Sequence, residues 1–248
     1  MEAGGEEVLV MKSVVIKVKR YDGQKTWWQE YKVEAPSERI SVLDLLVRLR
    51  EEQDPTLAVR YSCRMAICGS CGMVINGVPR LACQTLVSEL KTEFITVEPM
   101  WNHKVIKDLV VDPEPDFEKV RRIKPYIIRD VKEIYETDKE FGQKPEELDK
   151  YYNFAYCIQC GLCMAACPIL ATNEKFLGPM ALNMAYRWSA DSRDQGWVER
   201  AKIIDTEDGL WPCHLAYTCS AVCPRGVDPG MSIQLLKASL IRRTKRVL

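Results

Sequence analysis

The spacing of cysteine constrains this chain more than any other feature of its sequence. The 248 residues include 11 cysteines, which all fall in three short groups, at 63–83, 157–167 and 213–223. Buried cysteines that serve only as small hydrophobic residues would not gather in this way. Disulfides are disfavoured, because an odd number leaves one thiol over and thiols stay reduced in proteins that are not exported. The grouping therefore indicates metal ligation.

Charge and hydropathy exclude several classes of protein. The formal net charge is zero, which argues against nucleic-acid binding, since such proteins carry a clustered excess of basic residues. No stretch reaches the roughly 20 apolar residues that a transmembrane helix needs. The first ten residues, MEAGGEEVLV, are acidic and short of apolar residues, so we expect no secretory signal. These features predict a reducing, cytosol-like compartment.

The N-terminal part of the chain has the pattern of a small mixed sheet with one packed helix. Turn dipeptides stand at Asp22-Gly23 and Asn76-Gly77. Ser41 is an expected N-cap for a helix that runs to about Glu52, with Asp44 in its first turn. The expected strands are 13–19, 29–34, 73–75, 78–82 and 94–97. We therefore expect a first domain at 1–105.

Beyond this region the hydrophobic period becomes helical. The segment 111–125 contains three prolines and mixed charge, so we interpret it as a connector. The expected helices are 146–154, 180–188, 197–204 and 232–247. We therefore expect an all-α second domain at 106–248, and an α+β class for the whole chain.

The first cysteine group has the spacing of a plant-type [2Fe–2S] site. Four residues separate Cys63 from Cys68, two separate Cys68 from Cys71, and Cys83 follows after eleven more. Gly69 and Gly72 lie beside these cysteines, where they let the backbone turn tightly and direct N–H groups at sulfur. A zinc site is the alternative for four such thiolates.

The second group has the spacing of a bacterial ferredoxin. Its members are Cys157, Cys160, Cys163 and Cys167, followed by Pro168. In proteins with two clusters, the first three cysteines of such a run bind one cluster and the fourth binds the other.

The third group resembles the second but lacks one ligand. It contains Cys213, Cys219 and Cys223, and Ala216 stands where the full pattern would have a cysteine. Exchange of ligands between the two groups gives a four-thiolate [4Fe–4S] site and a three-thiolate site. The first would use Cys157, Cys160, Cys163 and Cys223, and the second Cys167, Cys213 and Cys219.

A site with three thiolates suits a [3Fe–4S] cluster. The alternative is a [4Fe–4S] cluster with water or another ligand on its unique iron, as in clusters that bind a substrate. With four, four and three ligands, all 11 cysteines are used. The intact protein is then expected to have no free thiol.

The three groups and the residues around them resemble the iron–sulfur subunit of succinate dehydrogenase and fumarate reductase, the complex II family. The resemblance covers nearly the whole chain. It depends on SCRMAICGSCGM at 62–73, CIQCGLCMAACP at 157–168 and CHLAYTCSAVCPRGVDP at 213–229. Shorter similar stretches are KDLVVD at 107–112, KPYII at 124–128, FLGP at 176–179 and SADSRDQG at 189–196.

The resemblance implies a β-grasp [2Fe–2S] ferredoxin domain followed by an all-α ferredoxin domain. It implies a flavoprotein partner with FAD, which performs the dicarboxylate chemistry, and a membrane anchor subunit, often with haem b, that helps to bind quinone. Electrons would pass from flavin through the [2Fe–2S], [4Fe–4S] and [3Fe–4S] clusters to quinone. The complex would lie on the cytoplasmic face of the cell membrane, or on the matrix side of the inner mitochondrial membrane.

The family's quinone pocket lies beside the [3Fe–4S] cluster. Carried over by position, the candidate residues are Pro168, His214, Leu215, Gln234 and Lys237. A histidine there can donate a hydrogen bond or a proton to quinone, and a lysine can stabilise the charge of reduced quinone. The alternatives are a packed or surface histidine and a solvated lysine on a helix.

One position departs from the dehydrogenases of the family. They have adjacent tryptophans shortly after the residue that matches Pro168, where this chain has Ala171 and Thr172. That resembles a fumarate reductase, whereas His214 after Cys213 resembles a dehydrogenase. Two other functions stay open on sequence alone: a soluble ferredoxin-like carrier without a membrane partner, and a zinc-stabilised interaction protein.

Overall fold

The computed structural model describes residues 12–37, 39–92, 94–244 and 246–247. The expected absence of a secretory signal concerns the start of the chain, which lies outside these residues. The chain divides into two compact units, and each is described by itself. The first is Met1–Met100 with Val105–Val111, and the second is Trp101–Lys104 with Asp112–Leu248. Within the described part of the chain, no helix combines the length and the apolar character needed to cross a bilayer.

A mixed five-stranded sheet forms the first unit. Its order is β2-β1-β5-β3-β4, and β1 pairs parallel with β5 while the other neighbours are antiparallel. Alternate residues of β1, such as Ile16 and Val18, are buried, as the period of a strand requires. The elements are β1 (Lys12–Tyr21), β2 (Thr26–Ala35), β3 (Gly72–Ile75), β4 (Val78–Leu81), the 3-10 turn η1 (Ser88–Leu90), β5 (Phe94–Glu98), β6 (Val105–Lys107) and β7 (Val110–Val111).

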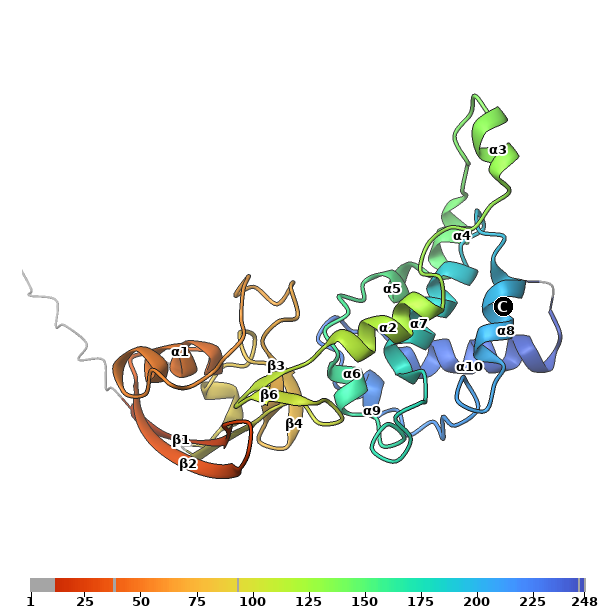
Figure 1. The fold of residues 1–248 in the computed structure, drawn as a ribbon. Coiled ribbons are helices and arrows are strands. Elements are labelled where there is room, and N and C mark those ends of the chain that lie inside the picture. The colour runs from red at the N-terminus through yellow and green to blue at the C-terminus, as the bar shows by residue number, and fades with distance from the viewer. Residues whose placement is uncertain (1–11, 38, 93, 245, 248) are drawn as a thin grey trace, which may run out of the picture. The chain divides into compact units, whose positions relative to one another are not determined.

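One helix, α1 (Val42–Glu52), packs against this sheet (Figure 1). Its N-terminus is a capping box, in which the Ser41 hydroxyl accepts from the N–H of Asp44 and the Asp44 carboxylate accepts from the N–H of Ser41. Its apolar face, with Leu45 and Leu46, is buried. The five strands, the helix and its N-cap confirm the prediction for this part of the chain.

The stretch KDLVVD completes the first unit through one buried carboxylate. Asp108 accepts from the Arg20 Nε at 2.8 Å and from the N–H groups of Tyr21 and Ala58 at 3.1 and 2.8 Å. The Arg20 guanidinium also reaches Asp54 at 2.6 Å. Because Arg20 and Asp108 are buried, these bonds fix the β6–β7 hairpin to the sheet.

The second unit is helical, with α7 at its centre. Helix α7 packs against α10, α2 and α5 (Figure 1). Helices α7 and α8 confirm the expected helices at 180–188 and 197–204. The elements are α2 (Glu114–Arg122), α3 (Val131–Glu136), α4 (Pro145–Asp149), α5 (Tyr152–Ala155), α6 (Leu162–Ala165), α7 (Gly178–Ser189), α8 (Trp197–Ile204), α9 (Thr218–Ala221) and α10 (Pro229–Ile241).

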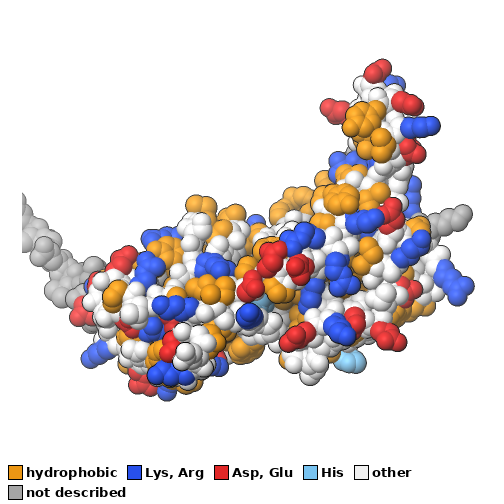
Figure 2. Space-filling view, in the orientation of Figure 1, with side chains coloured by type: hydrophobic (Ala, Val, Ile, Leu, Met, Phe, Trp, Pro, Cys, Tyr) orange, Lys and Arg blue, Asp and Glu red, His pale blue; other side chains and the backbone are white. Residues whose placement is uncertain are grey.

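Two expectations for the first part of this unit were wrong in detail, and one helix was missed. The supposed connector 111–125 contains α2, because Pro115 lies in the first turn of the helix, where its missing N–H costs nothing. The single helix expected at 146–154 is two short ones, α4 and α5, since Tyr151 between them leaves helical geometry and is buried. A short helix, α3, was not expected. It projects from the rest of its unit (Figure 1) and carries exposed hydrophobic side chains (Figure 2), among them Val131 and Tyr135.

The last helix begins and ends earlier than expected. Asp228 caps α10 by accepting from the N–H of Met231, so the helix starts at Pro229 and not at 232. It ends at Ile241, since Arg243 adopts a left-handed conformation and the N–H of Thr244 bonds back to the carbonyl of Ser239. Position 245 of the expected helix lies outside the described residues.

Candidate metal centres

The first cysteine group lies on a loop between α1 and β3 that directs backbone N–H groups at sulfur. The N–H groups of Met65, Ile67 and Cys68 donate to the Cys63 Sγ at 3.4, 3.4 and 3.2 Å. The N–H of Cys63 donates in turn to the Cys68 Sγ at 3.4 Å. Such donors stabilise negative charge on sulfur, which is what a thiolate ligand needs.

The loop reaches this arrangement through left-handed backbone at Arg64, Ala66 and Gly69. Only glycine adopts that conformation without cost, so the two other residues store strain in the loop. The loop thus winds tightly around Cys63 and directs backbone N–H groups at its sulfur, which suits a ligand of a bound cluster.

The cysteines of this first group differ strongly in pKa. Burial raises the pKa of Cys68, but hydrogen bonds from the Ser70 hydroxyl and from the N–H groups of Cys63 and Ser70 outweigh it and lower that pKa to about 6. Burial raises the pKa of Cys71 to about 12, and the neighbouring Cys83 contributes to the rise. A thiolate is therefore stabilised at the exposed end of the group and disfavoured at its buried end.

Four cysteines of the second unit line one cavity. They are Cys157, Cys160, Cys163 and Cys223. The rest of the lining is mostly apolar and comes from residues before α6, from α7, from the loop between α9 and α10 and from the start of α10: Ile158, Met180, Asn183, Pro224, Arg225, Val227 and Pro229.

The thiols of this cavity have raised pKa values, so a free-energy cost opposes their ionisation when no cation is near. Burial raises the pKa of Cys157 to about 12 and that of Cys160 to about 11, and the nearby Cys223 adds to both. Burial also raises the pKa of Cys163 well above its usual range. Because iron binds the thiolate form, its positive charge would offset this penalty. The donor set therefore fits an iron–sulfur cluster.

The remaining three cysteines form a second set, of which Cys167 and Cys219 are buried and Cys213 is partly buried. Burial raises the pKa of Cys167, and Cys213 raises it further. Burial raises the pKa of Cys219 to about 11, with added effects of Cys213 and Cys167. Cys219 also raises the pKa of Cys163, so the two sets are neighbours. Among the described residues, no three His, Cys, Asp or Glu side chains are placed to share a single metal ion.

Known proteins resemble the chain in both units. Residues 15–118 match the family described as 2Fe-2S iron-sulfur cluster binding domain, and residues 153–227 match the 4Fe-4S dicluster domain. The fumarate reductase iron-sulfur subunit of Mycobacterium tuberculosis is 42% identical over 231 residues, which is 92% of this chain and 93% of that protein. A mitochondrial succinate dehydrogenase [ubiquinone] iron-sulfur subunit of Oryza sativa is 40% identical over 84% of this chain and 68% of its own length.

The chain belongs to the iron–sulfur subunits of the succinate dehydrogenase and fumarate reductase family. A chain of the Mycobacterium smegmatis Sdh1 complex in the apo form has a TM-score of 0.86 and 29% identity, over 95% of this chain and 98% of that one. Membership confirms the α+β fold, with a [2Fe–2S] ferredoxin domain before a helical one. It also establishes the protein as an electron-transfer subunit of an oxidoreductase complex.

Two stretches that carry the family resemblance bind each other. In SADSRDQG, the Asp194 carboxylate accepts from the N–H of Ile128 at 2.8 Å, and the N–H of Gln195 donates to the carbonyl of Ile128 at 2.8 Å. The buried Arg200 donates to Asp194 at 2.7 Å and to the carbonyl of Lys124 at 2.9 Å. These bonds hold KPYII against the start of α8.

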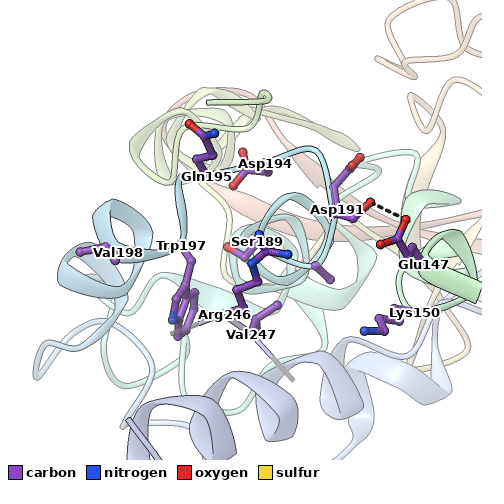
Figure 3. Close-up of a pocket in the computed structure, with 12 residues that line it drawn as sticks. Glu147, Lys150, Ser189, Asp191, Asp194, Gln195, Trp197, Val198, Arg246 and Val247 are labelled. Carbon is purple, nitrogen blue, oxygen red and sulfur yellow. Dashed lines mark hydrogen bonds between the residues drawn. The ribbon is translucent and has the colours of Figure 1, made fainter. Parts of the chain in front are cut away.

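The cavity beside these residues has a mixed polar and apolar lining, and Asp191, Asp194 and Glu147 face it (Figure 3). Each of these carboxylates already has partners. Asp191 accepts from Arg193 at 2.8 Å, Asp194 from Arg200, and Glu147 from the N–H of Lys144 at 2.9 Å. The stretch SADSRDQG therefore stabilises the helical unit.

The quinone candidates lie next to the third cysteine set in the chain or in space. Pro168 and His214 are exposed and follow Cys167 and Cys213 directly. The Lys237 Nζ donates to the carbonyl of Cys213 at 2.8 Å. Two more candidates share these elements: Leu215, whose N–H donates to the Cys213 Sγ at 3.4 Å, and Gln234, one turn before Lys237 on α10.

Sequence reasoning missed several residues around the cysteines. Ser70 was passed over although it lies between two candidate ligands, and it contributes to the low pKa of Cys68. Asn183 is a fully buried amide on α7 that lines the four-cysteine cavity, and its Oδ1 has no hydrogen-bond partner among the residues that the structure describes. A polar residue between Met180 and Met184 on an apolar face was a usable signal. Asn102, described below, left no such signal.

Proposed function

We propose that this subunit passes single electrons between the FAD of a flavoprotein subunit and a quinone held at a membrane anchor subunit, through three iron–sulfur clusters. The observation that carries the proposal is the division of the 11 cysteines into sets of four, four and three. The [2Fe–2S] cluster would be bound by Cys63, Cys68, Cys71 and Cys83. The [4Fe–4S] cluster would be bound by Cys157, Cys160, Cys163 and Cys223, and the [3Fe–4S] cluster by Cys167, Cys213 and Cys219.

Each cluster, when bound, accepts and releases one electron at a potential set by its type, its hydrogen bonds and its exposure to water. The residues of the chain control the last two. In the first unit, three backbone N–H groups donate to the Cys63 sulfur on a partly exposed loop. In the second unit, apolar side chains around Cys163 exclude water.

The side chain at position 216 is proposed to determine the type of the third cluster. Ala216 offers no ligand, and its neighbours Leu215 and Tyr217 both have left-handed backbone. A fourth iron at this site would have no thiolate of this chain, so a [3Fe–4S] cluster is favoured.

Partner subunits are proposed from the family and from the exposed side chains. Met65 and Ile67, on the loop of the first group, are 70% and 50% exposed. Such apolar side chains beside a ligand of the first cluster suit a protein partner, which we take to be the flavoprotein. At the third set, the exposed His214 and Pro168 suit a quinone at the anchor subunit, which on some complexes also holds haem b. The subunit itself would bind peripherally, at the cytoplasmic or matrix face of the membrane.

Low-temperature EPR of the native complex tests the proposal. A [3Fe–4S] signal is expected in the oxidised sample, and [2Fe–2S] and [4Fe–4S] signals after reduction with dithionite. The substitution Ala216→Cys is expected to replace the [3Fe–4S] signal by a second [4Fe–4S] signal. An oxidised wild-type sample with full iron content and no [3Fe–4S] signal would overturn the assignment and favour a substrate-binding [4Fe–4S] cluster.

The quinone assignment is tested separately: His214→Ala should slow electron transfer to quinone and leave reduction of an artificial acceptor unchanged.

A further inference from the structure

The segment 164–167 joins a ligand of one candidate cluster to a ligand of the next. Cys163 precedes it and Cys167 is its last residue. The segment is the end of α6, a helix of only four residues, and Pro168 follows it. Carbonyl groups at the end of a helix lack helical partners, and proline has no N–H to offer to them. Within the segment, backbone N–H groups reach only the carbonyl of Met164, to which the N–H of Cys167 donates at 3.2 Å, so the donors to the other carbonyls come from outside it.

Two side chains supply these donors. The Asn102 Nδ2 donates to the carbonyl oxygens of Met164, Ala165 and Cys167 at 3.0, 3.1 and 2.9 Å. The Thr218 hydroxyl donates to the carbonyl of Ala166 at 2.8 Å. All four carbonyls of the segment are thus bonded to side chains that lie 52 or more positions away in the chain.

The identity of Asn102 is determined by these partners. Carbonyl oxygens only accept, so the amide must present its two hydrogens, which three acceptors share. An aspartate in the same place would set a carboxylate against three acceptors. Asn102 has a φ of 60°, in the left-handed region that asparagine tolerates better than most residues.

A buried ion pair holds the short segment that carries Asn102. The His103 ring bonds through Nδ1 to the carbonyl of Trp101 at 2.7 Å and through Nε2 to the Asp116 carboxylate at 2.8 Å. Both partners accept, so the protonated imidazole can donate from both ring nitrogens at once. The His103 side chain is only 3% exposed. Asn102 is therefore held to α2 as well as to the end of α6.

We infer that Asn102 and Thr218 are positioning residues for electron transfer between the second and third clusters, because they fix the backbone that separates Cys163 from Cys167. This inference rests on the proposed function, since it presumes that those two cysteines bind different clusters. The hydrogen bonds from Asn102 and Thr218 hold the backbone of 164–167 in one conformation. They thereby keep the distance and the orientation between Cys163 and Cys167 constant. Neither residue would touch a reacting atom.

Four substitutions distinguish hydrogen-bond donation by Asn102 and Thr218 from the other roles of these two side chains. Asn102→Gly keeps the left-handed backbone without strain and removes the amide. Asn102→Asp keeps the size and replaces a donor with an acceptor. Thr218→Val keeps the shape and removes the hydroxyl, and Thr218→Ser restores it. Asn76→Gly is the matched control, because Asn76 is also left-handed, at 48°, and lies in the first unit.

The readout is EPR of the purified complex, with the [2Fe–2S] spins of the same chain as internal standard, together with the midpoint potential of the third cluster. Asn102→Gly and Thr218→Val should lower the ratio of [3Fe–4S] to [2Fe–2S] spins by about two- to tenfold, as the loss of one or two hydrogen bonds implies, or shift that potential. Asn102→Asp should have the larger effect. Thr218→Ser and Asn76→Gly should match the wild type.

Three results would overturn the inference. One is a wild-type ratio, line shape and potential in both Asn102→Gly and Thr218→Val. Another is a wild-type spin ratio and potential in Asn102→Asp, which would show that the backbone conformation at this position matters and the hydrogen-bond donor does not. The third is a parallel loss of all three signals, which would mean that the side chains serve folding in general. If instead the wild type lacks the [3Fe–4S] and [4Fe–4S] signals, the proposed function fails before the variants are compared.

Discussion

The two units hold their cysteines in opposite ways. In the first unit, Cys63 and Cys68 lie on a surface loop, where backbone N–H groups donate to sulfur and the pKa of Cys68 is lowered to about 6. In the second unit, Cys163 and Cys219 lie in the hydrophobic core, and burial raises their pKa values. In the first unit only Cys71 of the four candidate ligands is buried, whereas in the second unit the core includes several candidate ligands.

This difference teaches that one kind of ligand serves two structural roles. A cluster on the loop is an attachment to a unit that has its own core around Ile16 and Leu45. A cluster among Cys157, Cys160, Cys163 and Cys223 is part of the core, because without iron the cavity would contain only thiols that resist ionisation.

Removal of iron should therefore give the largest contrast. We expect chelation of iron to unfold much of the second unit, at a cost on the order of 10 kcal/mol if the clusters behave as other structural metal sites do. The sheet of the first unit should stay folded. Amide hydrogen exchange read by mass spectrometry distinguishes α7 and α10 from β1 and β5. Equal loss of protection in both units would contradict the comparison.

A buried arginine in each unit gives the next largest effect. Arg20 pairs with Asp108, and Arg200 with Asp194, and all four side chains are at most 4% exposed. Arg20→Met and Arg200→Met should each lower the free energy of unfolding by about 3–5 kcal/mol, because a buried carboxylate loses its partner. Urea unfolding of the iron-loaded protein measures the change.

The control for that pair is an exposed arginine. Arg121 contacts Glu114, and both side chains are more than half exposed. Arg121→Met should cost less than about 1 kcal/mol. If Arg200→Met cost no more than Arg121→Met, the network that joins KPYII to SADSRDQG would be dispensable.

A dependence on pH that comes from histidine should appear in the second unit, which contains both histidines of the chain. Burial lowers the pKa of His103, but the hydrogen bond and the charge of Asp116 outweigh it, so the pKa lies above its usual range. The pair therefore stabilises the fold fully below the unfolded pKa of about 6.5, and this contribution is lost as pH rises through the folded pKa.

Unfolding measured from pH 6 to pH 9 tests this sign. The wild type should lose stability across that range, and His103→Gln should lack that part of the slope. The chain has only two histidines, and the other, His214, is exposed. A slope that survives in His103→Gln would assign the effect to another group.

The smallest effect concerns the acidity of one thiol. No thiol of the intact protein should react with iodoacetamide. After removal of iron, Cys68 should react first at neutral pH, since its pKa of about 6 leaves it as thiolate, while the pKa of Cys71 is about 12. Ser70→Ala removes one donor and should shift the reaction profile of Cys68 to higher pH. Mass spectrometry of the alkylated peptides gives both profiles, and an unchanged profile would mean that the backbone donors suffice.

Local patterns predicted a large part of the fold. The strands of the first unit follow from alternation, as with Ile16 and Val18, and α1 follows from the capping box of Ser41 and Asp44. Helix α8 agrees with its expected bounds. Helix α2 was missed, because the cost of a proline depends on its place in the helix: Pro115 falls in the first turn.

By itself, the sequence determined the number and spacing of the candidate ligand cysteines, the family and the absence of a fourth cysteine at Ala216, because these are properties of neighbours along the chain. Tertiary structure alone decided that Cys223 approaches Cys157 and Cys160, that Lys237 bonds to Cys213, and that Asn102 bonds to the end of α6. These partners are 24 or more positions apart. The physical reason is that local pattern sets which groups can ligate or donate, whereas the packing of α6, α9 and α10 sets which of them meet.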